Sequence, residues 1–125
     1  MEFAKGTRET AIQDKSFLFA IRIVKLYQYL CNEKKEYVLS KQLLCSGTSI
    51  GANVSEAERA QSPADFYSKM SISLKEASET YYWLRLLHAT DYLANNEFYS
   101  MEADVKELLA LLTTICKTAQ QNSEK

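Results

Sequence analysis

Glycine and proline are scarce in this chain, which has three Gly and one Pro among 125 residues. A β-sandwich needs these residues for its many tight turns, and a dinucleotide-binding loop needs several glycines. The sequence therefore excludes both architectures. With 46% hydrophobic and 25% charged residues, the composition instead predicts one mostly helical globular domain over residues 1–125.

Long apolar runs and a surplus of one charge are also missing. No stretch approaches the ~20 apolar residues that cross a bilayer, and the first ten residues contain no apolar run or small-residue cleavage site. We therefore expect a cytoplasmic protein that does not contact a membrane. The 15 basic and 16 acidic residues give a formal net charge of -1. This balance excludes the globally basic signature of many nucleic-acid binders but permits a local basic patch.

Histidine and cysteine offer little to catalysis or metal binding. His88 is the only histidine, which excludes a di-iron site built from two Glu-x-x-His motifs. Arg85 lies too close to His88 for an Arg-x4-6-His ribonuclease pair, so we expect His88 to pack at the bundle edge. Cys31, Cys45 and Cys116 are odd in number and far apart, which predicts neutral thiols. We expect no catalytic residue, no metal and no cofactor.

Apolar residues recur at helical spacing in four segments, which predicts helices over about residues 14–33, 36–61, 63–93 and 96–119. The clearest boundary is at Ser62, because its hydroxyl can cap a helix and Pro63 suits the first turn. Short connectors separate the four segments. The sequence therefore predicts an all-α fold, an antiparallel up-down-up-down four-helix bundle.

The first predicted helix has more apolar surface than one core can use. It carries two adjacent apolar stripes: Phe17, Ala20, Ile21, Val24 and Tyr27 form the first, and Phe19, Ile23, Leu26 and Leu30 form the second. A small bundle has no central helix that buries its whole circumference. We therefore expect the first stripe to face the core and the second to contact another subunit, so that the protein self-associates.

The segment SGTSIGANVSEA places Gly47 and Gly51 inside the second predicted helix. Each glycine costs about 1 kcal/mol relative to alanine in a helix, so close contact with a neighbouring helix must compensate, and Asn53 then needs a hydrogen-bond partner. The alternative interpretation is a phosphate-binding loop. That alternative fails because the segment has no Gly-Lys-Ser/Thr ending and no preceding strand.

Five basic residues form a candidate nucleic-acid-binding face. Lys15, Arg22 and Lys25 lie on the polar strip of the first predicted helix, and Lys41 and Arg59 share the outer face of the second. Phosphate contacts need such a cationic strip, and oligomer symmetry would multiply it. An ordinary solvated face is the alternative, and the residues alone favour it.

Two carboxylates, Glu76 and Glu79, flank the third predicted helix near Trp83. Acid–base chemistry would need a cleft that raises one pKa, so a solvated or interfacial flank is the favoured interpretation, with Glu79 paired to a Lys or Arg of a neighbouring helix or subunit. Tyr81, Tyr82 and Trp83 point around the helix, so at least one of them must be exposed or contact a partner.

Three segments closely resemble a known family: FAIRIVKLYQYL, SGTSIGANVSEA and DFYSKMSISLKEASETYYWLRLL. They are similar to bacterial four-helix bundle proteins related to the 23S ribosomal RNA intervening-sequence protein, over residues from about 14 to 118. The same superfamily includes the accessory protein of diversity-generating retroelements, a barrel-like homopentamer that binds nucleic acid and a reverse transcriptase. The most specific matching positions, interpreted as structural or interface residues, are Ser49, Asn53, Glu56, Glu76, Glu79 and Trp83.

The resemblance implies a ring-like homo-oligomer, such as a pentamer, that binds RNA or DNA and has no enzyme activity. One position departs from the family, because many relatives carry Arg where this chain has Cys45, and the cationic face loses a charge there. The first functional hypothesis is a non-enzymatic oligomeric bundle that binds structured RNA or DNA through its basic face. The alternative is an interaction scaffold or accessory subunit that recruits a protein partner.

Overall fold

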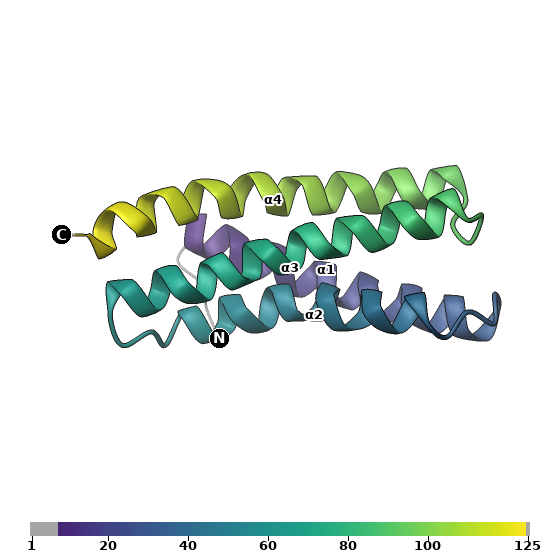
Figure 1. Ribbon diagram of the computed structural model, residues 1–125, viewed down its shortest axis with the longest axis horizontal. Helices are drawn as coiled ribbons and strands as arrows, with labels where there is room; N and C mark the ends of the chain where they lie inside the picture. The colour runs from purple at the N-terminus through teal and green to yellow at the C-terminus, as the bar shows by residue number, and fades with distance from the viewer. Residues whose placement is uncertain (1–7, 125) are drawn as a thin grey trace.

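The computed structural model describes residues 8–124 and contains four long α-helices around one core (Figure 1). The helices are α1 (Arg8–Asn32), α2 (Leu39–Ala57), α3 (Pro63–Ala89) and α4 (Asn95–Ser123). Residues 8–124 include no β-strand. The predicted all-α, four-helix fold is confirmed, and none of the four helices combines the length and apolar content that a membrane crossing requires.

Some helix ends match the predicted bounds and others differ. Local groups at the helix ends explain the three cases below. Ser62 caps α3 as predicted, because its hydroxyl accepts the backbone N–H of Asp65 at 3.0 Å. Glu36, predicted to be helical, instead lies before α2, with its carboxylate accepting backbone N–H groups at the helix start. The helix α3 ends at Ala89 rather than at Leu93, since Asp91 adopts the left-handed backbone conformation (φ 70°).

The core is built from apolar side chains of all four helices. Its central members are each no more than 2% exposed: Phe19, Ile23 and Leu30 of α1, Leu43, Ile50 and Val54 of α2, Met70, Ala77, Leu84 and Leu87 of α3, and Val105, Leu108 and Leu112 of α4. On α3 and α4 these residues follow the alternating three- and four-residue spacing that the sequence predicts.

The rotation of α1 is opposite to the predicted one. The stripe containing Phe19 and Ile23 packs in the core, whereas Phe17, Ile21 and Val24 are 67%, 39% and 38% exposed. The prediction for α1 was therefore wrong about which stripe faces the core. The structure shows why, because α2 approaches α1 on the side that carries Ile23.

The two helical glycines allow this close approach. A Cβ atom at Gly47 would lie within 2.9 Å of three side-chain atoms of Ile23, and one at Gly51 would lie 3.3 Å from the backbone oxygen of Ser16. The helix α2 continues through both glycines. Tertiary contact compensates for their low helix propensity, as the sequence predicts.

Small polar residues connect α2 to α3. The Ser73 hydroxyl donates a hydrogen bond to the backbone oxygen of Ile50 at 2.9 Å, and the hydroxyl oxygens of Thr80 and Ser46 are 3.0 Å apart. Ser46, Ser73 and Thr80 are each at most 1% exposed. Each buried hydroxyl therefore has a partner, which removes the cost of burying it, and the two helices are held in register.

Candidate nucleic-acid interface

The five candidate basic residues divide into a paired set and a free set. The Lys15 ammonium lies 3.1 Å from Glu107 of α4. The Arg22 guanidinium pairs with Asp104 of α4 and donates a second hydrogen bond to the Ser100 hydroxyl at 2.9 Å. These contacts join α1 to α4, and because residue numbers rise along α1 while those of the partners fall along α4, the two helices run in opposite directions. Lys15 and Arg22 are therefore largely neutralised within the chain.

The other three basic residues keep their charges free. Lys25, Lys41 and Arg59 are exposed, and none of them has a carboxylate within ion-pair distance among residues 8–124. Lys41 lies in the first turn of α2, whereas Arg59 lies in the turn after α2, which ends at Ala57. The two were predicted on one helix face, but only Lys41 belongs to the helix.

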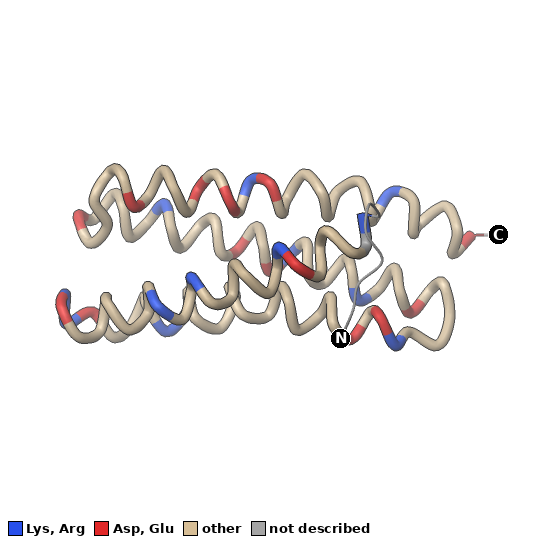
Figure 2. The backbone as a smooth tube through the Cα atoms, turned by 180° about the vertical axis from the view of Figure 1, so that it is seen from behind, with Lys and Arg blue, Asp and Glu red and all other residues tan. Residues whose placement is uncertain are grey.

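The distribution of charge along the bundle follows this division. Figure 2 shows mainly acidic positions along α4, at the top of the view, and several basic positions along α1. The helix α4 supplies Glu107 and Asp104 to the paired set. The three candidate cations that remain free lie on α1, on α2 and in the turn after α2, which we call the α1–α2 side of the bundle.

An exposed apolar stripe lies on the same side of α1 as a free cation. The stripe consists of Phe17, Leu18, Ile21 and Val24, of which Phe17 and Leu18 are 67% and 61% exposed. Lys25 follows Ile21 by one helical turn. The outer surface of α1 therefore combines exposed, large apolar side chains with a positive charge that has no ion-pair partner within residues 8–124.

The matching motif residues of α2 form a chain of contacts within that helix. The Ser49 hydroxyl donates to the backbone oxygen of Cys45 at 2.6 Å, and the Asn53 amide donates to the backbone oxygen of Ser49 at 2.8 Å. Asn53 thus finds its hydrogen-bond partner one turn back along α2. Glu56 instead reaches α3, where its carboxylate lies 3.4 Å from the Lys69 ammonium.

The motif residues of α3 form an acidic flank beside an aromatic ring. The Trp83 indole N–H donates to the Glu79 carboxylate at 3.0 Å. No Lys or Arg within residues 8–124 pairs with Glu79, contrary to the favoured interpretation for a neighbouring helix of the same chain. Partial burial of Glu76, and then the nearby charge of Glu79, raise the pKa of Glu76 above its ordinary value. The charge of Lys75 acts on Glu76 in the opposite direction, but neither carboxylate forms an ion pair within residues 8–124.

Two further expectations concern α3 residues. His88 packs at the edge between α3 and α4 as predicted, with its ring stacked on Phe98 at 4.1 Å between centroids. Tyr82 is 53% exposed, which confirms that the run of three aromatic residues cannot all face the core. Cys45 is exposed on α2.

No pattern in the sequence indicates the pairing of Lys15 and Arg22. Their partners on α4 are 92 and 82 residues away along the chain, and only the assembled bundle brings these residues together. The surplus apolar arc of the first predicted helix indicates that α1 has an exposed apolar stripe. It does not indicate which of the two stripes is exposed.

Comparison with known proteins identifies the family. Residues 8–114 match the family described as 23S rRNA-intervening sequence protein. The chain is also similar to a crystal structure of a protein with unknown function from the S23 ribosomal protein family of Bacteroides thetaiotaomicron, at 53% sequence identity and a TM-score of 0.87, covering 89% of this chain and 99% of that one. No curated protein matches this chain. From residue 8 to residue 114, in sequence and in fold, the chain belongs to the 23S rRNA-intervening sequence protein family.

Proposed function

We propose that this protein is a non-enzymatic, self-assembling four-helix bundle that binds structured RNA through the free cations of its α1–α2 side. One observation carries the proposal: the exposed apolar stripe of α1 lies beside Lys25, while Lys25, Lys41 and Arg59 have no carboxylate partner within residues 8–124. The stripe supplies a contact between copies, and the cations supply phosphate contacts.

Self-assembly follows from the cost of leaving the stripe in water. Contiguous exposed apolar surface rimmed by polar groups marks an interaction site, and Phe17, Leu18, Ile21 and Val24 form such a surface. Burying it against a second copy recovers roughly 25 cal/mol for each Å² of apolar surface removed from water. A closed ring, five-membered as in the retroelement accessory protein of the same superfamily, would repeat the free cations around one axis.

RNA binding follows from the free cations and from the family. A lysine or arginine without an internal partner can neutralise a phosphate and release the counterions condensed there. Lys15 and Arg22 contribute less, because an RNA phosphate would have to displace Glu107 or Asp104. The family description names a ribosomal RNA sequence, which makes a folded RNA the first ligand to test and duplex DNA the second.

Self-assembly is tested by measuring the molar mass in dilute solution with light scattering. We expect a wild-type mass well above the 14.3 kDa of one chain and a mass close to one chain for Phe17→Asp and Ile21→Lys. Tyr37→Asp is the matched control, since Tyr37 is exposed on the connector between α1 and α2, and it should assemble like the wild type. A wild-type protein that remains a 14.3 kDa species would overturn self-assembly.

RNA binding is tested by a salt titration of matched charge variants. Lys25→Gln, Lys41→Gln and Arg59→Gln should each reduce the log–log salt slope by about one. Lys15→Gln and Arg22→Gln remove the same formal charge from paired positions and should change the slope less. The proposal fails if the wild type does not bind structured RNA even at low salt, or if the free and paired sets have equal effects.

The alternative function is a scaffold that recruits a protein partner through the acidic flank of Glu76, Glu79 and Trp83. The observation in its favour is that no Lys or Arg within residues 8–124 pairs with either carboxylate. This alternative becomes the better explanation if the wild type does not bind RNA while Glu79→Lys abolishes binding to a purified partner protein.

A further inference from the structure

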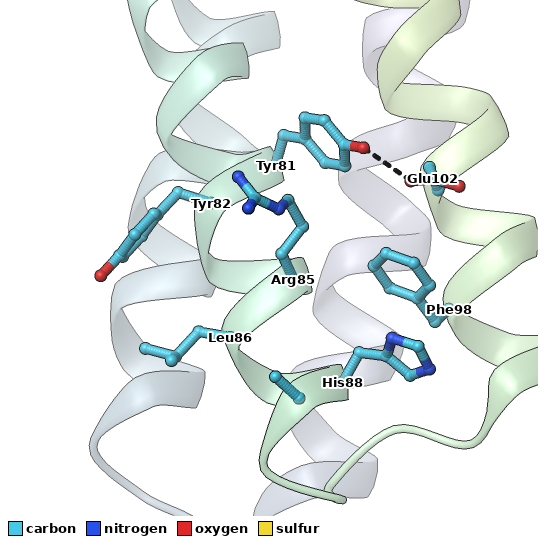
Figure 3. Close-up of a pocket in the computed structure, with 8 residues that line it drawn as sticks. Tyr81, Tyr82, Arg85, Leu86, His88, Phe98 and Glu102 are labelled. Carbon is cyan, nitrogen blue, oxygen red and sulfur yellow. Dashed lines mark hydrogen bonds between the residues drawn. The ribbon is translucent and has the colours of Figure 1, made fainter.

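A shallow cavity of about 410 Å³ lies at the end of the bundle beside the turn between α3 and α4. Figure 3 shows Tyr82 to one side of it, His88 and Phe98 to the other, and Arg85 between them. All of these residues except Phe98 come from the last two turns of α3. The cavity is separate from the free cations of the α1–α2 side.

One wall of the cavity is a fixed aromatic stack. The rings of His88 and Phe98 are parallel to within 4°, with 4.1 Å between their centroids. A hydrogen bond of 2.8 Å between His88 Nε2 and the Asn95 side-chain oxygen holds the imidazole in place. The wall is therefore preorganised, so that a flat ligand would meet it without first ordering it.

The opposite side carries an exposed ring. Tyr82 is 53% exposed, and its ring contacts Trp83 edge to face, with 5.1 Å between centroids. Because about half of the Tyr82 side chain is exposed, part of its ring surface is available for stacking.

Charge distinguishes this cavity from a purely apolar one. The Arg85 guanidinium lies 5.8 Å from the centre of the Tyr81 ring and has no carboxylate within ion-pair distance among residues 8–124. Glu102, the carboxylate at the rim, accepts a hydrogen bond from the Tyr81 hydroxyl at 2.6 Å and lies 3.6 Å from the Lys106 ammonium. The Lys106 ammonium thus compensates the negative charge of Glu102, whereas no carboxylate within residues 8–124 pairs with Arg85.

We propose that this cavity binds a nucleotide unit, with the base against the aromatic side chains of the lining, Tyr82 and His88, and the phosphate paired with Arg85. Aromatic side chains stack bases of any sequence, and the planar guanidinium matches a phosphate through paired hydrogen bonds. An uncharged apolar ligand fits less well, since it would cover Arg85 without supplying a counter-charge. Free mononucleotides and single-stranded RNA present the same chemistry. The inference extends the RNA binding proposed above, but it uses different residues.

The only tryptophan of the chain, Trp83, contacts Tyr82 and can report binding by its fluorescence. Adenosine 5′-monophosphate should quench it saturably, and adenosine, which has no phosphate, should bind several-fold more weakly. Arg85→Gln should remove the difference between the two ligands. Tyr82→Ala should weaken binding of both by about tenfold, as loss of one stacking ring does. Because Tyr82→Ala also alters the environment of Trp83, amide chemical shifts serve as a second readout.

Two variants control for aromatic and charge loss elsewhere. Tyr37→Ala removes an exposed ring on another connector, and Lys75→Gln removes an exposed, unpaired charge on α3. Both should bind adenosine 5′-monophosphate like the wild type. A ten-residue oligoadenylate distinguishes the two kinds of ligand. If it binds more tightly than the mononucleotide, the ligand is a single strand of RNA, and if it binds equally tightly, the ligand is a free nucleotide.

The inference is overturned if adenosine 5′-monophosphate produces no saturable change, or if Arg85→Gln and Tyr82→Ala bind it like the wild type. Its failure differs from failure of the proposed function. Structured-RNA binding is tested by Lys25→Gln and Lys41→Gln on the α1–α2 side, whereas mononucleotide binding is tested by Tyr82→Ala and Arg85→Gln at the cavity.

Discussion

Gly47 of α2 touches Ile23 of α1 so closely that a Cβ atom added at Gly47 would lie 2.7 Å from Ile23 Cγ1. Ile23 is fully buried, and its branched side chain has few alternative rotamers. The contact sets the distance between α1 and α2 and, with it, which stripe of α1 faces the core.

Gly47→Ala is expected to destabilise the fold by about 1–3 kcal/mol, the usual cost of overpacking a core, although alanine favours a helix by about 1 kcal/mol over glycine. Urea unfolding measures the change. Gly51→Ala is the comparison, and its loss should be smaller because the nearest atom is 3.3 Å from the added Cβ. A Gly47→Ala variant as stable as the wild type would contradict this view of the contact.

Glu36→Ala should destabilise the protein by about 1–2 kcal/mol, as loss of a helix cap does. The Glu36 carboxylate is only 6% exposed and accepts the backbone N–H groups of Val38, Leu39 and Ser40 at 2.9, 2.9 and 3.1 Å. These donors have no partner within the helix. Thermal denaturation should show a clear loss for Glu36→Ala and almost none for Glu33→Ala, an exposed neighbour. Equal melting temperatures for the two variants would be the contrary result.

Glu76→Gln should make the protein more stable than the wild type at pH 7. Burial and the charge of Glu79 raise the pKa of Glu76 in the folded state, so the folded protein binds this proton more tightly than the unfolded chain. The contribution of Glu76 to stability is therefore greatest below its ordinary pKa and is lost as the pH rises through the folded-state pKa. Glutamine cannot ionise and avoids this loss.

Unfolding at two pH values tests the Glu76 prediction. The advantage of Glu76→Gln should disappear below about pH 4, where both the folded and unfolded states of the wild type are protonated. Glu33→Gln removes an exposed carboxylate and should show no such pH dependence. An advantage of Glu76→Gln that persists at low pH would assign the effect to something other than ionisation.

The three thiols should react with a disulfide reagent at different rates. Cys45 is exposed, Cys31 is half-buried near the Ser40 hydroxyl, and Cys116 is buried, which raises the pKa of its thiol. Since the thiolate is the reactive form, we expect a fast, an intermediate and a very slow phase. Cys45→Ser should remove the fast phase and Cys116→Ser should leave it. A fast phase that survives in Cys45→Ser would be inconsistent with the exposure of this residue.

The sequence predicts what depends on local pattern. The cap at Ser62 and the buried stripe of α3 require only spacing and short-range hydrogen bonds, and both are found. The rotation of α1 is different, because its two adjacent stripes are both apolar and only the contact between Gly47 and Ile23 decides between them.

The candidate site was predicted in part for the same reason. The sequence identifies Lys15 and Lys25 equally as members of one polar strip, but Glu107 neutralises only the first of them, from 92 residues away. The cavity beside Arg85 likewise needs Phe98 of another helix to complete its wall. Residue spacing within one helix does not indicate that Glu107 pairs with Lys15 or that Phe98 completes the wall of the cavity.

The helix α1 begins and α4 ends at the same end of the bundle (Figure 1), while the aromatic cavity lies beside the turn that joins α3 to α4. If the chain is attached to a biosensor surface at the end of α4, the attachment point at Ser123 lies about 38 Å from Phe98, at 1.5 Å of rise per helical residue. Immobilisation through the C-terminus should therefore leave the opposite tip of each molecule turned toward the flowing analyte.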